Sequence, residues 1–309
     1  MFERTALIGA GAVGASIAAM MIEAGVPLTI VADRARARRI ADDGLTVNGR
    51  LVRPPVDPEA SGGPYPFVIV ATKSTHLERA LPLVTRAAGS EGVVLSLLNG
   101  ISSEGLIRDA LTAAQTDPSR RVVPAMILGI DAVRSDSGVT YLNRGTIHYG
   151  ADPARAPVPD AILDAVQATF DAAAIPARRA HDITRTLWWK FMINVGINQA
   201  SAVLGAPYGL FQDSDAARDL MLSAMEEVLE LSERAGTGLS RADLDAWLET
   251  LAGLDPGGKT SMLQDVEANR PTEVDLFAGT VLELAERYAV DVPVNRTLYR
   301  IVRALESRS

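Results

Sequence analysis

The chain of 309 residues contains no cysteine. This absence excludes disulfide bonds, thiolate metal ligands and a cysteine nucleophile, and it is typical of a protein kept in a reducing cytoplasm, where we expect this one. Histidine is nearly absent as well. The three that occur, His76, His148 and His181, are far apart and lack the spacing of a metal-binding pair on a helix. The sequence therefore predicts no metal site.

Long apolar runs and an excess of positive charge are also missing. No apolar run approaches the roughly 18 residues of a membrane span, and no basic leader precedes a cleavage site. The net charge of −8 argues against a nucleic-acid partner, because such binding depends mainly on neutralising phosphates. With 48% hydrophobic and 22% charged residues, the chain can bury a large core. Its length is typical of two domains.

A glycine-rich turn follows the first apolar run. The residues are Gly9-Ala10-Gly11-Ala12-Val13-Gly14, between a predicted strand at 5–8 and a predicted helix that ends near Gly25. In this pattern the first glycine permits a tight turn, the second lets the backbone approach a pyrophosphate, and the third lets the helix pack closely on the strand. The free N–H groups of the helix N-terminus would hold the anion. We interpret the turn as a dinucleotide site.

The periodicity of the chain changes along its length. Up to about residue 126, short apolar runs at 28–32, 67–71, 93–97 and 122–126 alternate with helical patterns, as in a parallel sheet covered on both faces. Residues 129–150 predict short antiparallel strands, and 157–174 one more helix. Residues 54–64 look like a surface loop, and beyond Pro176 only helical patterns occur, at 182–204, 213–235, 240–252, 259–269, 272–289 and 294–306. The sequence thus predicts an α/β fold, in which a Rossmann-type doubly wound domain (1–179) precedes an all-helical domain (180–309).

One of these predicted helices carries an unusual polar stripe. Lys190, Asn194 and Asn198 recur every fourth residue, so they share one face of a helix whose other positions are almost all apolar. Polar groups on a buried helix must find partners or cost several kcal/mol, on the order of 2–7. The stripe either forms a structural hydrogen-bond network or faces a ligand, and we favour the ligand.

Five motifs in order resemble the ketopantoate reductase family, the 2-dehydropantoate 2-reductases of pantothenate biosynthesis and their paralogues. The resemblance covers nearly the whole chain and rests on the glycine turn, Thr72-Lys73, Leu97-Leu98-Asn99-Gly100, Trp189-Lys190-x-x-x-Asn194-x-x-x-Asn198, and Ser261-Met-Leu-Gln-Asp265 with Arg270-x-Thr272-Glu273-Val-Asp275. It implies an NADP-dependent oxidoreductase that reduces a 2-oxo acid, most directly ketopantoate to pantoate. The oligomeric state, including a homodimer, is left open.

The resemblance also implies roles for individual residues. Lys190 would be the general acid that protonates the substrate oxygen, with Asn194 and Glu273 completing the catalytic set. An ammonium suits this role because it both stabilises a developing alkoxide and supplies the proton. The substrate would be bound by Asn99, Asn194, Asn198 and Ser261. The cofactor would be bound by Gly9, Ala10, Gly11, Ala12, Val13, Gly14, Asp33, Arg34, Lys73 and Asn99.

Each assignment has a structural alternative. Thr272 and Asp275 would suit a capping box, with Glu273 favourable in a first helical turn for its charge alone. Ser261 would suit a helix N-cap, and Asn99-Gly100 an ordinary turn. Lys73 alone would be read as a solvated lysine. The Trp188–Trp189 pair is assigned to the core.

The residues after the second predicted strand do not decide whether the cofactor carries a 2′-phosphate. The family resemblance favours NADPH, and Arg34, Arg36, Arg38 and Arg39 could bind a 2′-phosphate. Asp33, however, ends the second predicted strand, where a carboxylate binds ribose hydroxyls and repels that phosphate. NADH is therefore the alternative.

Two departures from the family pattern leave the substrate open too. The family often has Pro-Asn-Gly where this chain has Pro207-Tyr208-Gly209, and an asparagine where it has Gly258. Reduction of a different 2-oxo acid is the first alternative. A dinucleotide sensor without turnover is the second, although a sensor has no need of a proton donor such as Lys190.

Overall fold

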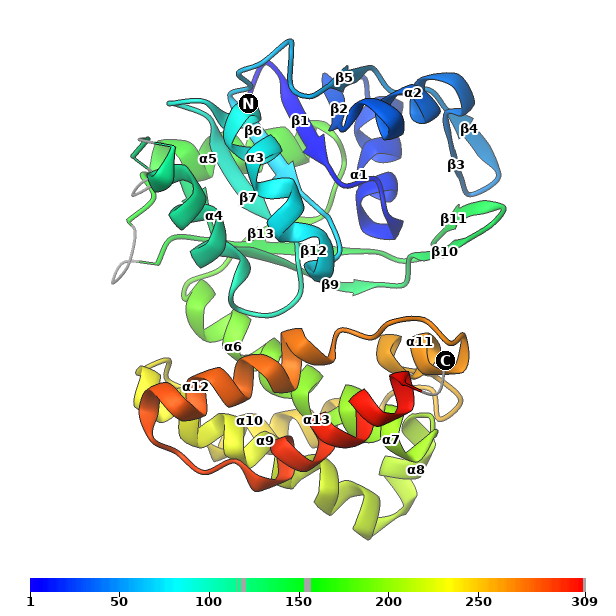
Figure 1. Ribbon diagram of the computed structural model, residues 1–309, viewed down its shortest axis with the longest axis vertical. Coiled ribbons are helices and arrows are strands. Elements are labelled where there is room, and N and C mark those ends of the chain that lie inside the picture. The colour runs from blue at the N-terminus through cyan, green and yellow to red at the C-terminus, as the bar shows by residue number, and fades with distance from the viewer. Residues whose placement is uncertain (115, 118–120, 153–156, 308–309) are drawn as a thin grey trace. The chain divides into compact units, whose positions relative to one another are not determined.

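The computed structural model describes residues 1–114, 116–117, 121–152 and 157–307. The chain divides into two compact units (Figure 1). Unit 1 comprises Met1–Asn99 and Ser103–Ile183, and unit 2 comprises Gly100–Ser102 and Thr184–Ser309. Among the described residues, no helix is long and apolar enough to cross a membrane.

Unit 1 is built on a six-stranded parallel sheet. Its strands lie in the order β5-β2-β1-β6-β7-β8, which is the doubly wound order in which the chain starts in the middle and reverses direction once. Their bounds are β1 Thr5–Ile8, β2 Leu28–Ala32, β5 Val56–Pro58, β6 Phe67–Val70, β7 Val93–Ser96 and β8 Val122–Val123. The direction in which the chain adds strands to the sheet changes between β1 and β6. Ligands are therefore expected at the carboxyl ends of these two strands. The predicted Rossmann-type fold is confirmed.

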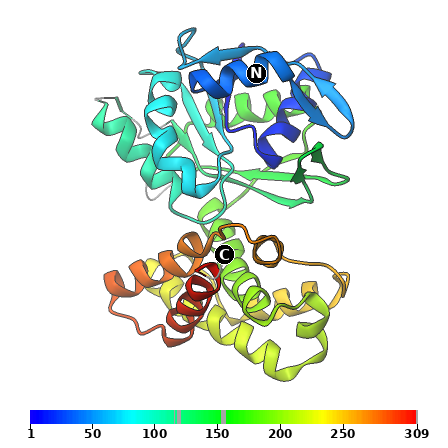
Figure 2. The same cartoon turned by 45° about the vertical axis from the view of Figure 1, so that its right-hand side comes forward.

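Helices cover both faces of this sheet, as Figure 2 shows. On one face, alternate strand residues such as Leu7 and Ile69 pack against α1 and α5; on the other, Ala6 and Val68 pack against α3 and α4. The helices of unit 1 are α1 Ala12–Glu23, α2 Arg34–Asp43, η1 Ser74–His76, α3 Leu77–Ala88, α4 Ser103–Ala113 and α5 Asp160–Ala172. Burial on both faces explains why these strands are apolar without alternation.

Two smaller sheets complete unit 1. One has the order β10-β11-β3-β4 and the other β13-β12-β9. Their strands are β3 Leu45–Val47, β4 Arg50–Val52, β9 Ala125–Ile130, β10 Val133–Ser135, β11 Gly138–Thr140, β12 Arg144–Tyr149 and β13 Ala177–Arg179. The predicted antiparallel strands in 129–150 are confirmed by the β10–β11 and β9–β12 pairs.

Three predictions about unit 1 are wrong. The run at 122–126 is not one strand, because Pro124 separates β8 of the main sheet from β9 of a smaller sheet. Residues 54–64 are not only a surface loop, because β5 lies within them and forms the edge of the main sheet by pairing with β2. Strand structure also continues beyond Pro176, where β13 pairs with β12. Both strands have three residues and lie at sheet edges, so neither leaves a recognisable apolar pattern.

Unit 2 is helical throughout its described part. Its elements are α6 Ile183–Ile193, η2 Asn194–Asn198, α7 Gln199–Leu204, α8 Tyr208–Asp213, α9 Asp215–Ala235, α10 Arg241–Ala252, α11 Ser261–Glu267, η3 Asp275–Gly279, α12 Thr280–Tyr288 and α13 Pro293–Glu306. The predicted helical domain is confirmed. The helix predicted at 182–204 is one continuous run, but the segment η2 in its middle is π-helical.

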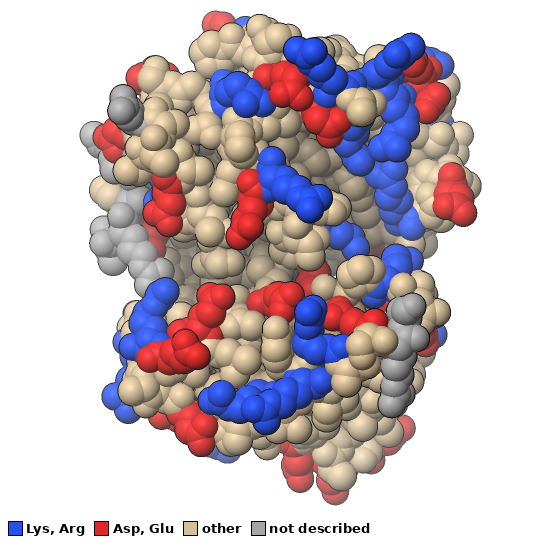
Figure 3. Space-filling model, in the orientation of Figure 1, with Lys and Arg blue, Asp and Glu red and all other residues tan. Residues whose placement is uncertain are grey.

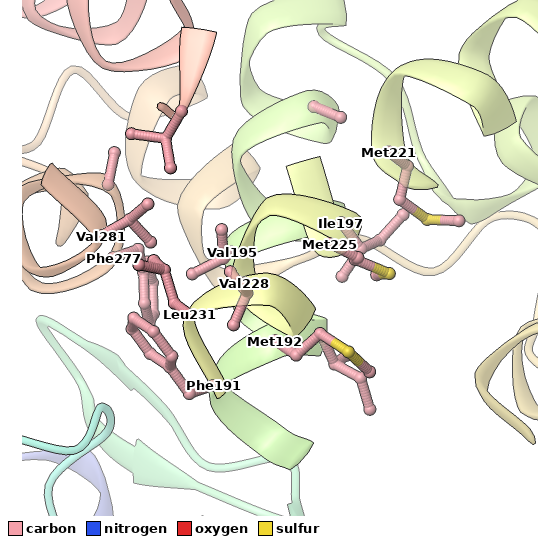
Figure 4. Packing of buried hydrophobic residues seen from close by; sticks show 14 of the residues in the cluster. Phe191, Met192, Val195, Ile197, Met221, Met225, Val228, Leu231, Phe277 and Val281 are labelled. Atoms are coloured by element: carbon pink, nitrogen blue, oxygen red, sulfur yellow. The ribbon is translucent and has the colours of Figure 1, made fainter. Parts of the chain in front are cut away.

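The core of unit 2 surrounds this helical run. Apolar side chains of α6 and η2, among them Phe191, Met192 and Val195, pack against α9 and against Phe277 of η3 (Figure 4). The close approach of α9 depends on Gly196, where a Cβ atom would lie 2.4 Å from Met225 Cγ and 2.9 Å from the Met221 carbonyl oxygen. Trp188 is buried in the same core, as predicted.

Candidate functional site

Two of the three glycines in the glycine turn lie where no side chain would fit. Gly9 has φ +101°, and a Cβ atom there would lie 2.6 Å from the backbone of Ala71. At Gly14 a Cβ atom would lie 1.8 Å from the Gly9 carbonyl oxygen. Gly11 differs, because a Cβ atom there would have no neighbour within 4 Å. The protein therefore requires Gly9 and Gly14 for its own packing, whereas the space at Gly11 is open to a ligand.

The start of α1 fits the pyrophosphate of a dinucleotide. No side chain caps this helix at Gly11, and no acidic residue lies in its first turn. The N–H groups of the first turn are thus left for an anion, which the helix dipole also favours. Nearby, after β6, the hydroxyl of Thr72 is buried without a hydrogen-bond partner among the described residues. An uncapped helix and an orphaned hydroxyl are what a missing polar ligand would leave.

The other predicted cofactor residues follow neighbouring strands of the sheet. Asp33 and Arg34 follow β2, Lys73 follows β6 and Asn99 follows β7. Because β2, β6 and β7 run parallel to β1 in the same sheet, the structure brings all of these residues to the edge that carries the glycine turn. Asp33 also has a structural function, since its Oδ1 accepts the Arg36 N–H at 2.8 Å and caps α2. Arg34 and Lys73 are exposed.

Two arginines contact the glycine turn directly. The guanidinium of Arg36 donates to the Ala10 carbonyl oxygen at 3.2 Å, and that of Arg134 donates to the same oxygen at 2.7 Å. Arg134 comes from β10 and was not predicted as a site residue. It lies 124 positions from Ala10 in the chain, and its surroundings in the sequence carry no motif.

In unit 2, the polar stripe lies where α6 passes into η2. Lys190 is in the last turn of α6, and Asn194 and Asn198 are the first and last residues of η2. Lys190 and Asn194 are half-buried and Asn198 is buried, at 7% exposed. A π-helical turn inside an α-helix is a costly geometry that often marks a functional site. Here it occurs between the two asparagines of the stripe.

Glu273 lies near enough to act on Lys190. Burial lowers the pKa of Lys190 to about 8, and the negative charge of Glu273 opposes this by favouring the ammonium. A lysine with this pKa is still largely protonated at neutral pH but gives up its proton far more readily than a solvated one. Glu273 and Lys190 of the predicted catalytic set are thus electrostatically coupled.

The alternative capping roles of the neighbouring residues are wrong. Thr272 does not form a capping box with Asp275, because the Thr272 N–H donates to Glu306 and Asp275 accepts from the Tyr299 hydroxyl. The Thr272 hydroxyl instead accepts the Val274 N–H at 3.2 Å. Nor does Ser261 cap α11. That function belongs to Thr260, whose hydroxyl accepts the Leu263 N–H at 3.2 Å, and Ser261 is exposed beside it. The alternative interpretation of Ser261 as a helix cap is therefore wrong.

The two departures from the family pattern are neighbours in space. The Tyr208 N–H donates to the Gly258 carbonyl oxygen at 3.0 Å, and a Cβ atom at position 258 would lie 2.9 Å from Cδ2 of the Tyr208 ring. The ring therefore occupies space that a side chain at 258 would need. Burial raises the pKa of the Tyr208 phenol.

Comparison with known families agrees with this organisation. The family model described as ketopantoate reductase PanE/ApbA matches residues 5–153, and the model of its C-terminal domain matches residues 182–306. Between them they cover both units.

Relatives and solved structures are similar over nearly their full lengths. A 2-dehydropantoate 2-reductase of Pyrococcus horikoshii is 24% identical over 97% of both chains, and one of Mycobacterium tuberculosis is 26% identical over 97% of this chain and 96% of its own. Among solved structures, a PanE/ApbA family ketopantoate reductase from Ralstonia eutropha has a TM-score of 0.83 at 23% identity, covering 99% of both chains. A D-mandelate dehydrogenase with NADH and anilino(oxo)acetate has a TM-score of 0.84 at 20% identity, covering 99% of both. At these identities the solved structures establish the fold.

Proposed function

The chain belongs to the ketopantoate reductase family, and we propose that it reduces a 2-oxo acid to the 2-hydroxy acid with Lys190 as the general acid. It is an oxidoreductase acting on CH–OH groups, and it uses a nicotinamide cofactor. The observation that carries the proposal is the half-buried Lys190, whose pKa burial lowers to about 8 and whose ammonium the charge of Glu273 favours.

The chemistry follows from the charge that the reaction creates. A nicotinamide, when bound, supplies the hydride that is added to the carbonyl carbon. The carbonyl oxygen becomes an alkoxide and takes a proton from Nζ of Lys190. Partial burial helps this transfer, because it brings the acidity of the ammonium closer to neutral pH and strengthens its attraction to the developing charge. Glu273 keeps the lysine protonated before reaction, and Asn194 would orient it together with the substrate.

We propose that residues 1–179 bind the cofactor and residues 180–309 the substrate. In the first part, the turn Gly9–Gly14 would hold the pyrophosphate, and Lys73 and Asn99 would reach the cofactor from the ends of β6 and β7. Asn99 would also contact the substrate. In the second part, Asn194, Asn198 and Ser261 would bind the 2-oxo acid. Our proposal for the cofactor is NADPH, supported by the arginines at the glycine turn, with NADH as the alternative that Asp33 favours.

Ketopantoate is the substrate that the names of the curated relatives suggest, and it is our first proposal. A second candidate is a 2-oxo acid with a more apolar substituent. It is favoured by Tyr208, whose ring fills the space beside Gly258 where the family often has amides. Exchanging two amides for an aromatic ring replaces hydrogen-bond donors and acceptors by apolar surface.

A spectrophotometric screen tests the proposal. Oxidation of NADPH and NADH would be followed with ketopantoate and with branched, aromatic and small 2-oxo acids. We expect turnover with at least one 2-oxo acid, and the ranking of kcat/KM separates the two substrate candidates. If no 2-oxo acid is reduced while dinucleotide binding is measurable, the sensor hypothesis replaces the enzyme.

The remaining expectations belong to the same proposal. We propose a cytoplasmic enzyme of pantothenate biosynthesis and a homodimer; one solved relative, from Staphylococcus aureus, is described as a dimeric ketopantoate reductase. Sedimentation analysis of the purified chain checks the oligomeric state.

A further inference from the structure

The hairpin β10–β11 brings a cation to the glycine turn. This hairpin continues the small sheet of β3 and β4, because Val139 of β11 pairs with Val47 of β3. Figure 3 shows lysine and arginine side chains gathered on this side of unit 1, over α2 and the small sheet. Arg134, on the first strand of the hairpin, and Arg36 of α2 both donate to the Ala10 carbonyl oxygen.

Three of the arginines in this region line one cavity. A cavity of about 250 Å³ is bounded by Arg36, Arg39 and Arg134, together with the tip of the hairpin at 135–138. The carboxylates of Asp43 and Asp136 also line it. Nevertheless, none of the three arginines forms an ion pair within 4.0 Å among the described residues. Burial lowers the pKa of the half-buried Arg36, and the charges of Arg134 and Arg39 lower it further.

A small core of its own holds the hairpin in place. Val139 of β11 is buried against Ala15 of α1 and Val47 of β3. At Gly138, a Cβ atom would lie 2.5 Å from the Thr46 carbonyl oxygen, so the two backbones are in close contact. Because α1 also carries the glycine turn, this packing fixes the position of Arg134 relative to the dinucleotide site.

We propose that Arg134 and Arg36 together bind the 2′-phosphate of the cofactor's adenosine, so that the β10–β11 hairpin determines the preference for NADPH. This inference rests on the proposed function. In doubly wound domains the adenosine ribose lies between the glycine turn and the end of the second strand, where an arginine accommodates the 2′-phosphate. Two guanidiniums provide parallel N–H donors that match a phosphate and neutralise its charge.

The position of Asp33 is compatible with this assignment. A carboxylate at the end of β2 repels a 2′-phosphate unless it is compensated. Here Oδ1 of Asp33 accepts the Arg36 N–H as the cap of α2, and its charge favours the protonated guanidinium of Arg36. Around the Ala10 carbonyl oxygen, the cations of Arg36 and Arg134 then outnumber the single carboxylate of Asp33. A chain with Asp33 and Arg36 alone would lack that excess.

Binding measurements with ligands that differ only in the phosphate test the inference. Calorimetric titration of the full chain would compare 2′-phosphoadenosine 5′-phosphate with adenosine 5′-phosphate, and fluorescence titration would compare NADPH with NADH. For Arg134→Ala we expect about 10-fold to 100-fold weaker binding of the two 2′-phosphate ligands, with the other two changed by less than about 3-fold. Arg134→Lys should recover part of the loss. The matched control is Arg50→Ala. Arg50 lies in the same small sheet, but it does not line the cavity and forms an ion pair with Glu23 at 3.0 Å.

Several results would overturn the inference. It fails if the wild-type chain prefers NADH, if Arg134→Ala keeps the wild-type preference for NADPH, or if it weakens all four ligands equally. A folded chain that binds neither dinucleotide would instead refute the proposed function itself. A melting curve for each variant establishes that the protein is folded.

Discussion

The two units prepare for their ligands in opposite ways. In unit 1 the glycine turn offers backbone, since side chains are absent at Gly9, Gly11 and Gly14 and the N-terminus of α1 is uncapped. In unit 2 the helix that carries Lys190 and Asn198 offers side chains on an otherwise apolar surface. A pyrophosphate has the same shape in every dinucleotide, so a backbone cradle suffices. A proton donor needs a tuned acidity, which only a side chain in a chosen environment can have.

The difference extends to what each site costs. The glycine turn has one conformation, which its strands and helix enforce, and it places few polar side chains in buried positions. The helical run α6–η2, which we call the lysine helix, places the ammonium of Lys190 and the carboxamides of Asn194 and Asn198 beside a hydrophobic core. It also contains a π-helical turn. Local departures from ideal geometry and buried polar groups persist where function requires them.

The largest expected effect is that of Lys190→Ala. Removal of the general acid should lower kcat by about 10² or more, whereas the Kd of the dinucleotide should change little because the glycine turn lies in the other unit. Steady-state kinetics and fluorescence titration measure the two quantities. Lys259→Ala is the control, since Lys259 is an exposed lysine of unit 2 that pairs with Glu267. Normal turnover by Lys190→Ala would remove the catalytic assignment.

Within the glycine turn, two substitutions should separate binding from folding. Gly11→Ala adds a methyl group to open space, so the free energy of unfolding should be unchanged while the dinucleotide Kd rises about 10-fold or more. Gly14→Ala places the methyl group 1.8 Å from the Gly9 carbonyl oxygen, which should cost at least about 3 kcal/mol of stability. Urea unfolding and cofactor titration measure both. A Gly11→Ala protein that binds as wild type would show that no ligand comes close to this position.

In the lysine helix, Gly196→Ala tests the packing of the π-helical turn. The added methyl group would meet Met225 and the backbone of Met221, so we expect a loss of about 1–3 kcal/mol in the free energy of unfolding. Gly105→Ala in α4 is the matched control, because nothing lies within 4 Å of its Cβ position. There the better helix propensity of alanine should stabilise the protein by about 0.5–1 kcal/mol. Equal effects at both positions would contradict the packing described.

The smallest expected effect concerns pH. Reduction requires the protonated lysine, so kcat/KM should be full below a pKa of about 8 and fall as the pH rises through it. Since Glu273 raises the pKa of Lys190, Glu273→Gln should move this decline to lower pH. Glu267→Gln, which changes an exposed carboxylate, should leave it in place. A profile that Glu273→Gln moves to higher pH would reverse the sign of the interaction.

Much of the fold could be predicted from the sequence, because the buried strands and amphipathic helices have strong patterns of their own. The strands β5 and β13 could not, since three-residue edge strands are defined by their partners. The site shows the same division. The glycine turn and the lysine stripe are local and were predicted, whereas Arg134 reaches Ala10 only through a hairpin that the topology returns to the glycine turn. Nor did the sequence indicate the π-helical turns, whose extra residue leaves the helical pattern almost intact.

The most direct test of the account is chemical rescue of Lys190→Ala with small alkylammonium ions. If Lys190 acts as the proton donor, the rate of NADPH or NADH oxidation by the variant in the presence of a 2-oxo acid should rise in proportion to the concentration of the protonated amine. The dinucleotide Kd should stay at its wild-type value throughout. Wild-type turnover of the variant without any amine, or a rate that follows the unprotonated amine instead, would contradict the account.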